Sequence, residues 1–214
     1  MRNLIAFLTC LAVPTMGGAH PHVFVKAGVS VVFDRQGDVA IHLDWEYDEF
    51  FSLLVTSDLG LDMDGDLVLT DDEQRRLEEE IAAWPPDFAG DLEVMQAGEV
   101  LPLGEKYAHT MVYEEGIFIE RHARPVAADL SDAPLRIRVY DPAFYTAYDL
   151  TGPVTVTGRD DCTVEIFRAD LDAAYALAES LMDGVSFEDQ GPDDYFPEIG
   201  DAFADTIEVT CAAL

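Results

Sequence analysis

The sequence predicts an α+β fold in which antiparallel β-sheets carry an inserted helix–loop–helix unit and a C-terminal helix. Short runs of alternating apolar and polar residues recur between turn residues over 22–45 and 92–140, as in antiparallel strands. Two segments with apolar residues at helical spacing, one around Phe51 and Leu54 and one around Leu77, flank an acidic loop at 62–73. A third helical pattern covers 171–182, where one side is apolar and contains Ala174, Leu177, Ala178 and Leu181.

The first 19 residues have the three parts of a secretory signal peptide. Arg2 gives a positive start, 4–13 is an apolar run, and Gly17-Gly18-Ala19 is a small-residue cleavage site. Cleavage would leave 20–214, which we interpret as a single α+β domain with the helical insertion at about 47–84. Because no later apolar run approaches the roughly 20 residues that a spanning helix needs, we expect a periplasmic protein that does not insert into the membrane.

The chain is strongly acidic, with 43 Asp and Glu against 12 Lys and Arg and a formal charge of −31. Such a surface repels nucleic acids and anionic membranes, and it attracts cations over long distances. Nucleic acid is therefore excluded as a partner. Two explanations of the charge remain open, because it suits adaptation to a saline habitat as well as metal binding.

Export also determines the interpretation of the cysteines. Removal of Cys10 with the signal peptide leaves Cys162 and Cys211, and in an oxidising compartment a single pair more often forms a disulfide than a metal site. We therefore predict a Cys162–Cys211 disulfide that joins the C-terminal segment to the strand at 163–167.

The strand pattern places three histidines. Apolar and polar residues alternate over 39–46, so His42 is expected on the outer face of the sheet. His109 and His122 lie on the two arms of a predicted hairpin. A two-residue turn at Glu115-Gly116 would place them opposite each other, whereas a three-residue loop would place them on opposite faces. Since glycine suits the longer loop and glutamate suits the shorter turn poorly, we predict that they form no two-histidine site.

The acidic loop matches the ligand spacing of a calcium-binding EF-hand. Such a loop supplies side-chain oxygens at positions 1, 3, 5, 9 and 12 and a backbone carbonyl at position 7. Counted from the first aspartate, these positions hold Asp62, Asp64, Asp66, Val68 (carbonyl), Thr70 and Glu73. Position 6 usually holds glycine, but here it is Leu67, and a left-handed leucine costs about 1–2 kcal/mol. We therefore expect weak Ca²⁺ binding, with a dissociation constant on the order of 10⁻⁴ to 10⁻³ M.

Two other interpretations of this loop remain open. A shifted frame would place Gly65 at position 6, but it would lose one ligand and the bidentate glutamate, so we prefer the frame that starts at Asp62. Thr70 and Glu73 also match a capping box for the second helix, which needs no metal and is compatible with one.

Cleavage after Ala19 would create a second candidate metal site at His20-Pro21-His22. The free amine and imidazole of His20, with His22 two residues further on, suit Cu(II), Zn(II) or Ni(II) better than Ca²⁺. Pro21 has no amide proton to lose, so a square-planar site that uses its backbone nitrogen is excluded. Further ligands would come from elsewhere in the chain, the candidates being His22, His42, His109 and His122.

Separated motifs in a fixed order give the chain a family resemblance. They are His20-Pro21-His22-Val23-Phe24, the segment 45–51, the acidic loop with its Thr-x-x-Glu cap, and 135–142. Together they resemble the DUF1007 family, exported bacterial proteins of unknown function that are catalogued as the periplasmic component of an uncharacterised transport system. The resemblance implies an association with transport, often of nickel, cobalt or zinc. Family members usually carry glycine where this chain has Leu67, so the departure bears on the calcium site and not on the resemblance.

Three functions are compatible with the sequence. We favour a non-enzymatic, periplasmic metal-binding accessory protein of a transition-metal transport system, with a weak calcium loop and a membrane metal transporter as partner. One alternative is a copper protein with a histidine brace at His20, and another is a structural or interaction protein whose calcium loop only sets stability. The sequence contains no G-x-S-x-G or H-E-x-x-H motif, and we assign no catalytic residue.

Overall fold

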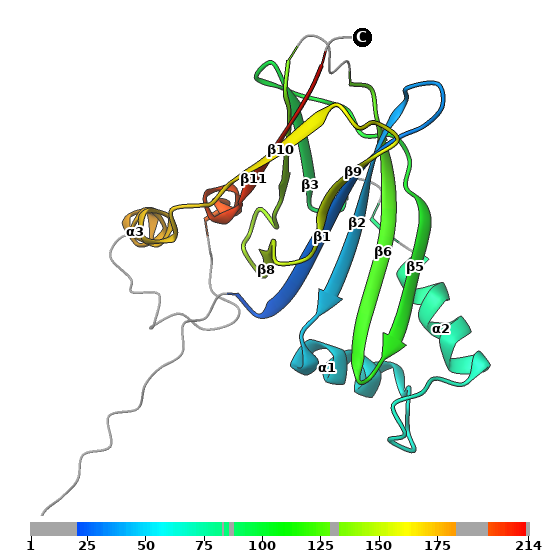
Figure 1. Cartoon of the computed structure of the whole chain (residues 1–214). Helices are drawn as coiled ribbons and strands as arrows, with labels where there is room; N and C mark the ends of the chain where they lie inside the picture. The colour runs from blue at the N-terminus through cyan, green and yellow to red at the C-terminus, as the bar shows by residue number, and fades with distance from the viewer. Residues whose placement is uncertain (1–20, 83, 86–87, 129–132, 183–196, 213–214) are drawn as a thin grey trace, which may run out of the picture.

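The computed structural model describes residues 21–82, 84–85, 88–128, 133–182 and 197–212. Within them, two β-sheets pack against each other (Figure 1). The six-stranded sheet has the order β5 (Tyr107–Glu114), β6 (Ile117–Val126), β2 (Val39–Tyr47) and β1 (Val23–Phe33), and both β8 (Thr146–Asp149) and β9 (Val154–Thr157) pair with β1. The five-stranded sheet has the order β10 (Cys162–Phe167), β11 (Thr206–Cys211), β7 (Leu135–Val139), β3 (Leu92–Gln96) and β4 (Glu99–Val100).

The helices lie at the ends of the sheets. Helix α1 (Glu49–Leu59) and helix α2 (Asp71–Ala82) lie at one end of β2, β6 and β5, whereas α3 (Leu171–Leu181) lies away from them, beside the 3₁₀ helix η2 (Gly200–Phe203) (Figure 1). None of the described helices is long and apolar enough to cross a membrane. The predicted α+β class and the predicted C-terminal helix are confirmed.

The two sheets share one apolar core. Successive residues of a strand point to opposite faces, and along β1 every second residue from Val23 to Phe33 is buried. Strand β2 pairs with β1 in antiparallel register from Val25↔Tyr47 to Phe33↔Val39, which confirms the predicted hairpin. The second sheet contributes the residues that close this core, namely Leu92, Val94, Leu135, Ile137, Val139, Ile207 and Val209.

The sheets are mainly antiparallel, as predicted, but one edge of the six-stranded sheet is parallel. Strands β8 and β9 pair with β1 in parallel, starting at Val23↔Thr146 and Val29↔Val154. Each has four residues that are half-buried or exposed, so neither has the strong alternation that marks a strand in the sequence. Between them the Gly152 N–H donates to the Ala27 carbonyl at 3.0 Å, and an added Cβ on Gly152 would lie 2.7 Å from that oxygen.

Helix α1 follows its predicted apolar stripe in part, because Phe51 and Val55 are half-buried against the apolar clusters but Leu54 is not. Ser52 and Thr56 are buried, whereas Leu54 is 46 % exposed. The Ser52 hydroxyl accepts a hydrogen bond from the backbone N–H of Phe118 at 3.1 Å. A buried N–H without a partner would cost about 1–3 kcal/mol, and this contact with β6 explains why the serine and not the leucine faces inward.

Helix α3 follows its prediction in part. Its bounds agree with the predicted 171–182, and Ala174 and Ala178 are buried as expected. Leu177 and Leu181 of the same predicted side are exposed. The buried side of α3 is therefore narrower than predicted, because only its small residues face the core.

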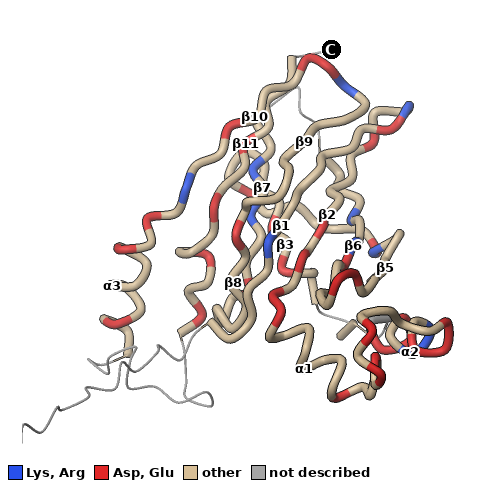
Figure 2. The backbone as a smooth tube through the Cα atoms, turned by 60° about the horizontal axis from the view of Figure 1, so that its bottom comes forward, with Lys and Arg blue, Asp and Glu red and all other residues tan. Residues whose placement is uncertain are grey.

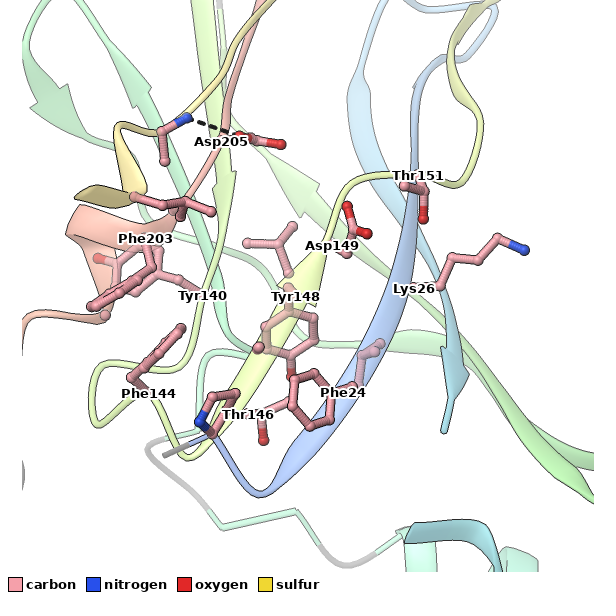
Figure 3. A pocket seen from close by; sticks show the side chains of 18 of the residues that line it. Phe24, Lys26, Tyr140, Phe144, Thr146, Tyr148, Asp149, Thr151, Phe203 and Asp205 are labelled. Carbon is pink, nitrogen blue, oxygen red and sulfur yellow. Dashed lines mark hydrogen bonds between the residues drawn. The ribbon is translucent and has the colours of Figure 1, made fainter. Parts of the chain in front are cut away.

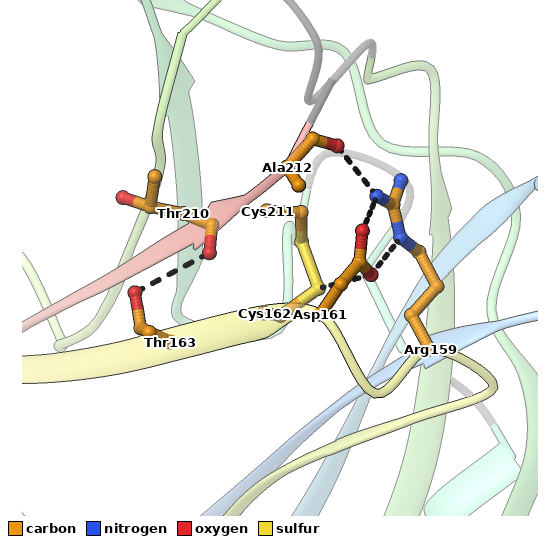
Figure 4. Close-up of a disulfide and its surroundings, with 7 residues drawn as sticks. All are labelled: Arg159, Asp161, Cys162, Thr163, Thr210, Cys211 and Ala212. Carbon is orange, nitrogen blue, oxygen red and sulfur yellow. Dashed lines mark hydrogen bonds and ion pairs between the residues drawn. A yellow bond between two sulfur atoms is a disulfide. The ribbon is translucent and has the colours of Figure 1, made fainter. Parts of the chain in front are cut away.

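A disulfide joins Cys162 of β10 to Cys211 of β11, as predicted (Figure 4). The two residues are direct neighbours across the antiparallel pair, and their Cα atoms lie 4.0 Å apart. Beside them Arg159 pairs with Asp161 at 2.6 Å and donates to the Ala212 carbonyl at 2.7 Å. The disulfide therefore links residues 49 positions apart and ties β11 to the edge of its sheet.

Reduction of this disulfide should lower the free energy of unfolding by about 4 kcal/mol, the chain-entropy value for a loop of this length. Urea unfolding with and without a phosphine reductant measures the change. The Cys162→Ser/Cys211→Ser variant is the control, because its midpoint should not respond to reductant. An unreduced chain whose midpoint equals that of this variant would contradict the prediction.

A half-buried carboxyl group joins the start of β3 to β8. Asp91 has a φ of 48°, its carbonyl accepts from the Tyr140 N–H at 2.8 Å, and its side chain accepts from the Tyr148 hydroxyl at 2.7 Å. Burial raises the pKa of Asp91 from 3.8 to about 7. Ionisation of Asp91 is therefore less favourable in the folded chain than in the unfolded chain.

Asp91 should make the protein less stable as the pH rises from about 4 to about 7. In this window the folded chain keeps a proton that the unfolded chain releases, so the free energy of unfolding falls and then levels off above the folded pKa. Asp91→Asn should leave stability nearly unchanged at pH 4 and raise it by roughly 2–4 kcal/mol at pH 8. Asparagine tolerates the left-handed backbone and keeps an acceptor for Tyr148.

Urea unfolding at both pH values checks this expectation. The exposed Asp149→Asn on β8 is the matched control, since it removes the same charge without the burial. A gain from Asp91→Asn that is equal at pH 4 and pH 8 would show that the effect is not ionisation.

Candidate functional site

Three aspartates converge in the loop between α1 and α2. One carboxylate oxygen each from Asp62, Asp64 and Asp66 lies within 4.8 Å of the others, and among the described residues no other group of three His, Cys, Asp or Glu does so. The loop follows Gly60, which ends α1 in the left-handed conformation. Acidic residues lie along most of the chain and are dense around this loop and α2 (Figure 2). These carboxylates form a set of hard oxygen donors that faces solvent.

The backbone of the loop agrees with the frame that starts at Asp62. Leu67 has a φ of 63°, so it adopts the left-handed conformation expected of position 6. Its N–H donates to Asp62 Oδ1 at 3.2 Å, and the Val68 N–H donates to Asp66 Oδ1 at 2.9 Å. Gly65 is also left-handed, with a φ of 71°. Leu67 thus meets the position-6 requirement of the preferred frame and Gly65 meets that of the shifted frame, so the backbone fits both frames.

Glu73 closes the loop through hydrogen bonds and lies outside the aspartate group. Its Oε1 accepts from the Asp62 N–H at 3.0 Å, and its Oε2 accepts from the N–H and hydroxyl of Thr70 at 2.9 and 2.7 Å. The Glu73 N–H donates back to the Thr70 hydroxyl at 3.4 Å, which completes the predicted capping box. The Thr70 hydrogen bonds hold the pKa of Glu73 below its usual value. Glu73 thus links the first and ninth positions of the loop.

Of the two candidate ligands at the N-terminus, His22 lies within the described residues. His20 and the predicted signal peptide at 1–19 lie outside the described residues. The His22 ring lies 4.8 Å from that of Tyr145, and the backbone N–H of His22 donates to the Tyr145 backbone carbonyl at 2.8 Å. His42 lies on the outer face of the first sheet, as predicted, with its Nε2 3.2 Å from the Tyr107 hydroxyl.

The predicted separation of His109 and His122 is wrong. The pairing Glu114↔Ile117 leaves Glu115 and Gly116 as a two-residue turn with φ values of 51° and 90°. This turn places the two histidines on the same face, and their ring centroids lie 5.9 Å apart. The prediction failed because the twist of a two-residue hairpin favours positive φ at both turn residues, and this preference outweighs the cost at a glutamate.

A cleft of about 650 Å³ opens between the β1–β8 edge and the α3–η2 region (Figure 3). Its two basic side chains are paired, Lys26 with Glu46 at 3.1 Å and Arg168 with Asp205 at 2.5 Å. Aromatic rings dominate the rest of the lining, among them Phe24, Tyr140, Phe144, Tyr148 and Phe203. The sequence did not predict this cleft, because the aromatic-rich run at 140–148, which supplies Tyr140, Phe144 and Tyr148 to the lining, is more typical of a structural corner than of a ligand site.

Comparison with known proteins identifies the family. The family described as "Protein of unknown function (DUF1007)" matches residues 5–211. No curated protein matches the chain. Because the match covers nearly the whole sequence, and because the motifs that suggested the resemblance lie within it, the chain belongs to the DUF1007 family.

Proposed function

We propose that this chain is a periplasmic, non-enzymatic metal-binding protein whose α1–α2 loop binds one Ca²⁺ ion. The convergence of Asp62, Asp64 and Asp66 within 4.8 Å supports the proposal. Ca²⁺ prefers six to eight oxygen ligands, and carboxylates at alternate positions of a loop after a helix are the donors it takes in an EF-hand. The disulfide between Cys162 and Cys211 agrees with an oxidising compartment.

Electrostatics favours a cation at this position. Each pair of carboxylates at about 4–5 Å repels by roughly 1 kcal/mol in water, and the net charge of −31 adds to the potential. A divalent ion relieves this repulsion. Because the site is open to solvent and Glu73 is engaged with Thr70, binding must displace water and turn the glutamate. Both costs agree with weak affinity, on the order of 10⁻⁴ to 10⁻³ M.

The loop also connects both helices to the first sheet. Asp62 Oδ2 accepts from the Tyr113 hydroxyl of β5 at 3.4 Å. Next to it Leu61, Leu77, Met111 and Phe118 form a separate apolar cluster between the helices and the β5–β6 hairpin. An ion bound at the loop would therefore stabilise the attachment of α1 and α2. The association with a membrane metal transporter, which the family resemblance implies, is the cellular role we propose for this unit.

Calcium should raise the melting temperature of the protein, and Glu73→Gln should abolish most of the increase. With a dissociation constant of about 1 mM, 10 mM Ca²⁺ should add about 1.4 kcal/mol, or roughly 3–6 °C. Glu79→Gln on α2 is the control, because it removes an equal charge outside the loop. A melting curve that does not respond to 10 mM Ca²⁺, or one that responds equally in both variants, would reduce the loop to a capped helix start.

Leu67→Gly should raise the melting temperature with and without calcium. The substitution relieves the left-handed strain of about 1–2 kcal/mol, less the entropy that glycine gains in the unfolded chain. Little burial is lost, since Leu67 is 47 % exposed. Differential scanning calorimetry measures the effect, with the exposed Leu53→Gly in α1 as a contrasting variant that should lower the melting temperature. A lower melting temperature for Leu67→Gly would contradict the assigned frame.

A further inference from the structure

A buried imidazole without hydrogen bonds lies on the inner face of β6. His122 is 2 % exposed, and neither of its ring nitrogens has a hydrogen-bond partner among the described residues. The rings of Trp45 and Trp84 pack edge-on against it, with centroids 4.6 and 4.8 Å away. Because an unsatisfied buried polar group costs about 1–3 kcal/mol, its retention in the core indicates a role beyond packing.

The imidazole of His109 lies beside it, with the two ring centroids 5.9 Å apart. The Nε2 of His109 lies 2.6 Å from Glu120 Oε1, and Glu120 Oε2 accepts from the Tyr47 hydroxyl at 2.7 Å. Since the carboxylate requires a donor, Nε2 carries the proton and Nδ1 presents its lone pair. A carboxylate on the second nitrogen is the arrangement that orients histidine ligands in metal sites.

The Nδ1 lone pair of His109 already accepts a hydrogen bond from the ammonium group of Lys106. Lys106 Nζ lies 2.7 Å from it and 4.1 Å from the ring centroid of Trp84. Gly90, with a φ of 78°, covers the site closely, because an added Cβ would lie 2.9 Å from Trp84 and 3.2 Å from His122 Nε2.

The ring nitrogens of His109 and His122 are the two candidate donors, so the site suits an ion with a low coordination number. Imidazole nitrogens suit copper or zinc, but structural zinc takes four ligands, and no third His, Cys, Asp or Glu ligand atom of the described residues converges here. Cu(I) accepts two or three ligands, and its single charge costs less to bury than a double charge. Two imidazoles on one ion, at metal–nitrogen distances of about 2 Å, place their centroids roughly 5–6 Å apart, which is the observed separation.

We propose that His109 Nδ1 and a ring nitrogen of His122 bind one Cu(I) ion against Trp84, in place of the Lys106 ammonium. Glu120 holds the His109 ring through Nε2, so the ring that must rotate toward the ion is that of His122, and the strand register does not change. This site deepens the proposed metal-binding function, and it shares no residue with the calcium loop. The exposed aspartates bind the hard ion Ca²⁺, and the two imidazoles bind the soft ion Cu(I).

Titration of the full chain, exported by its own N-terminal segment, with Cu(I) under anaerobic conditions tests the site. A chromophoric Cu(I) chelator as competitor gives the affinity. We expect one tightly bound ion and strong quenching of intrinsic fluorescence, because both tryptophans of the chain contact His122. Glu120→Gln should weaken binding by roughly 10–100-fold, as for other outer partners of metal ligands. His109→Gln and His122→Phe should weaken it further.

Lys106→Met should tighten binding, because it removes the internal competitor and leaves both histidines in place. This variant tests the site even where a core variant does not fold, and an unchanged affinity would overturn the displacement of Lys106. His42→Gln, on the outer face of the same sheet, should bind as the wild type does. Binding that survives both His109→Gln and His122→Phe, or that occurs without quenching, would overturn the site.

Three further titrations identify the bound metal and distinguish this site from the N-terminus and from the calcium loop. Zn²⁺ that displaces Cu(I) with the same histidine dependence would overturn the choice of metal. An extra residue ahead of His20 should leave Cu(I) affinity unchanged, whereas a loss would assign the copper to the N-terminus instead. Glu73→Gln should also leave it unchanged. A calcium loop that fails its own titration while this site binds Cu(I) would therefore remove only the calcium part of the proposed function.

Discussion

The pairing of β1 on both of its edges is the constraint on which the rest of the structure depends. One edge joins β2 in antiparallel register, and the other joins β8 and β9 in parallel. A slip of one residue would move every buried side chain of β1 to the opposite face, so burial of this strand fixes the register. The register then propagates outward through Trp45↔Glu120 and Leu43↔His122, which places polar residues of β6 in the interior. The position of the buried imidazoles is a consequence of this pairing.

The sequence predicted best those features that a single segment determines. The β1–β2 hairpin follows from local alternation, and the aspartate cluster follows from spacing within one loop, so neither needs knowledge of a distant partner. Which side chains of β5 and β6 lie together on the inner face of the sheet depends on the turn that joins the two strands. Glu115 adopts a φ of 51°, and the two-residue turn that this allows, together with the irregular register between Tyr107 and Thr110, determines how His109 faces His122. Side-chain preference predicted the wrong turn, because the twist of the paired strands sets a stronger requirement than the intrinsic cost at one residue.

Helix α1 shows a second way in which tertiary contacts overrule a pattern. Phe51 and Val55 of the predicted stripe pack against the apolar clusters, yet Leu54 of the same stripe is 46 % exposed. The inward position belongs to Ser52, whose hydroxyl satisfies the Phe118 N–H, and to Thr56, whose hydroxyl donates to the Ser52 carbonyl at 3.1 Å. Where a helix crosses the end of a sheet, satisfying a buried backbone donor can outweigh the burial of one leucine. Sequence periodicity contains no information about that donor.

The same physics separates the two proposed metal sites by the kind of ion. An acidic surface concentrates cations of every kind near the protein, so charge alone cannot discriminate between them. Discrimination requires desolvation. The exposed aspartates leave a bound ion partly hydrated, which suits Ca²⁺, a hard ion that accepts water among its ligands. His122 packs against both tryptophans and close to Gly90, and His109 packs against Trp84, so an ion bound here must lose its water and receives nitrogen donors in return. A hard ion such as Ca²⁺ loses more free energy than a soft ion does when nitrogen donors replace its water ligands. Burial of the histidine pair therefore excludes the hard ions, although the acidic surface attracts them.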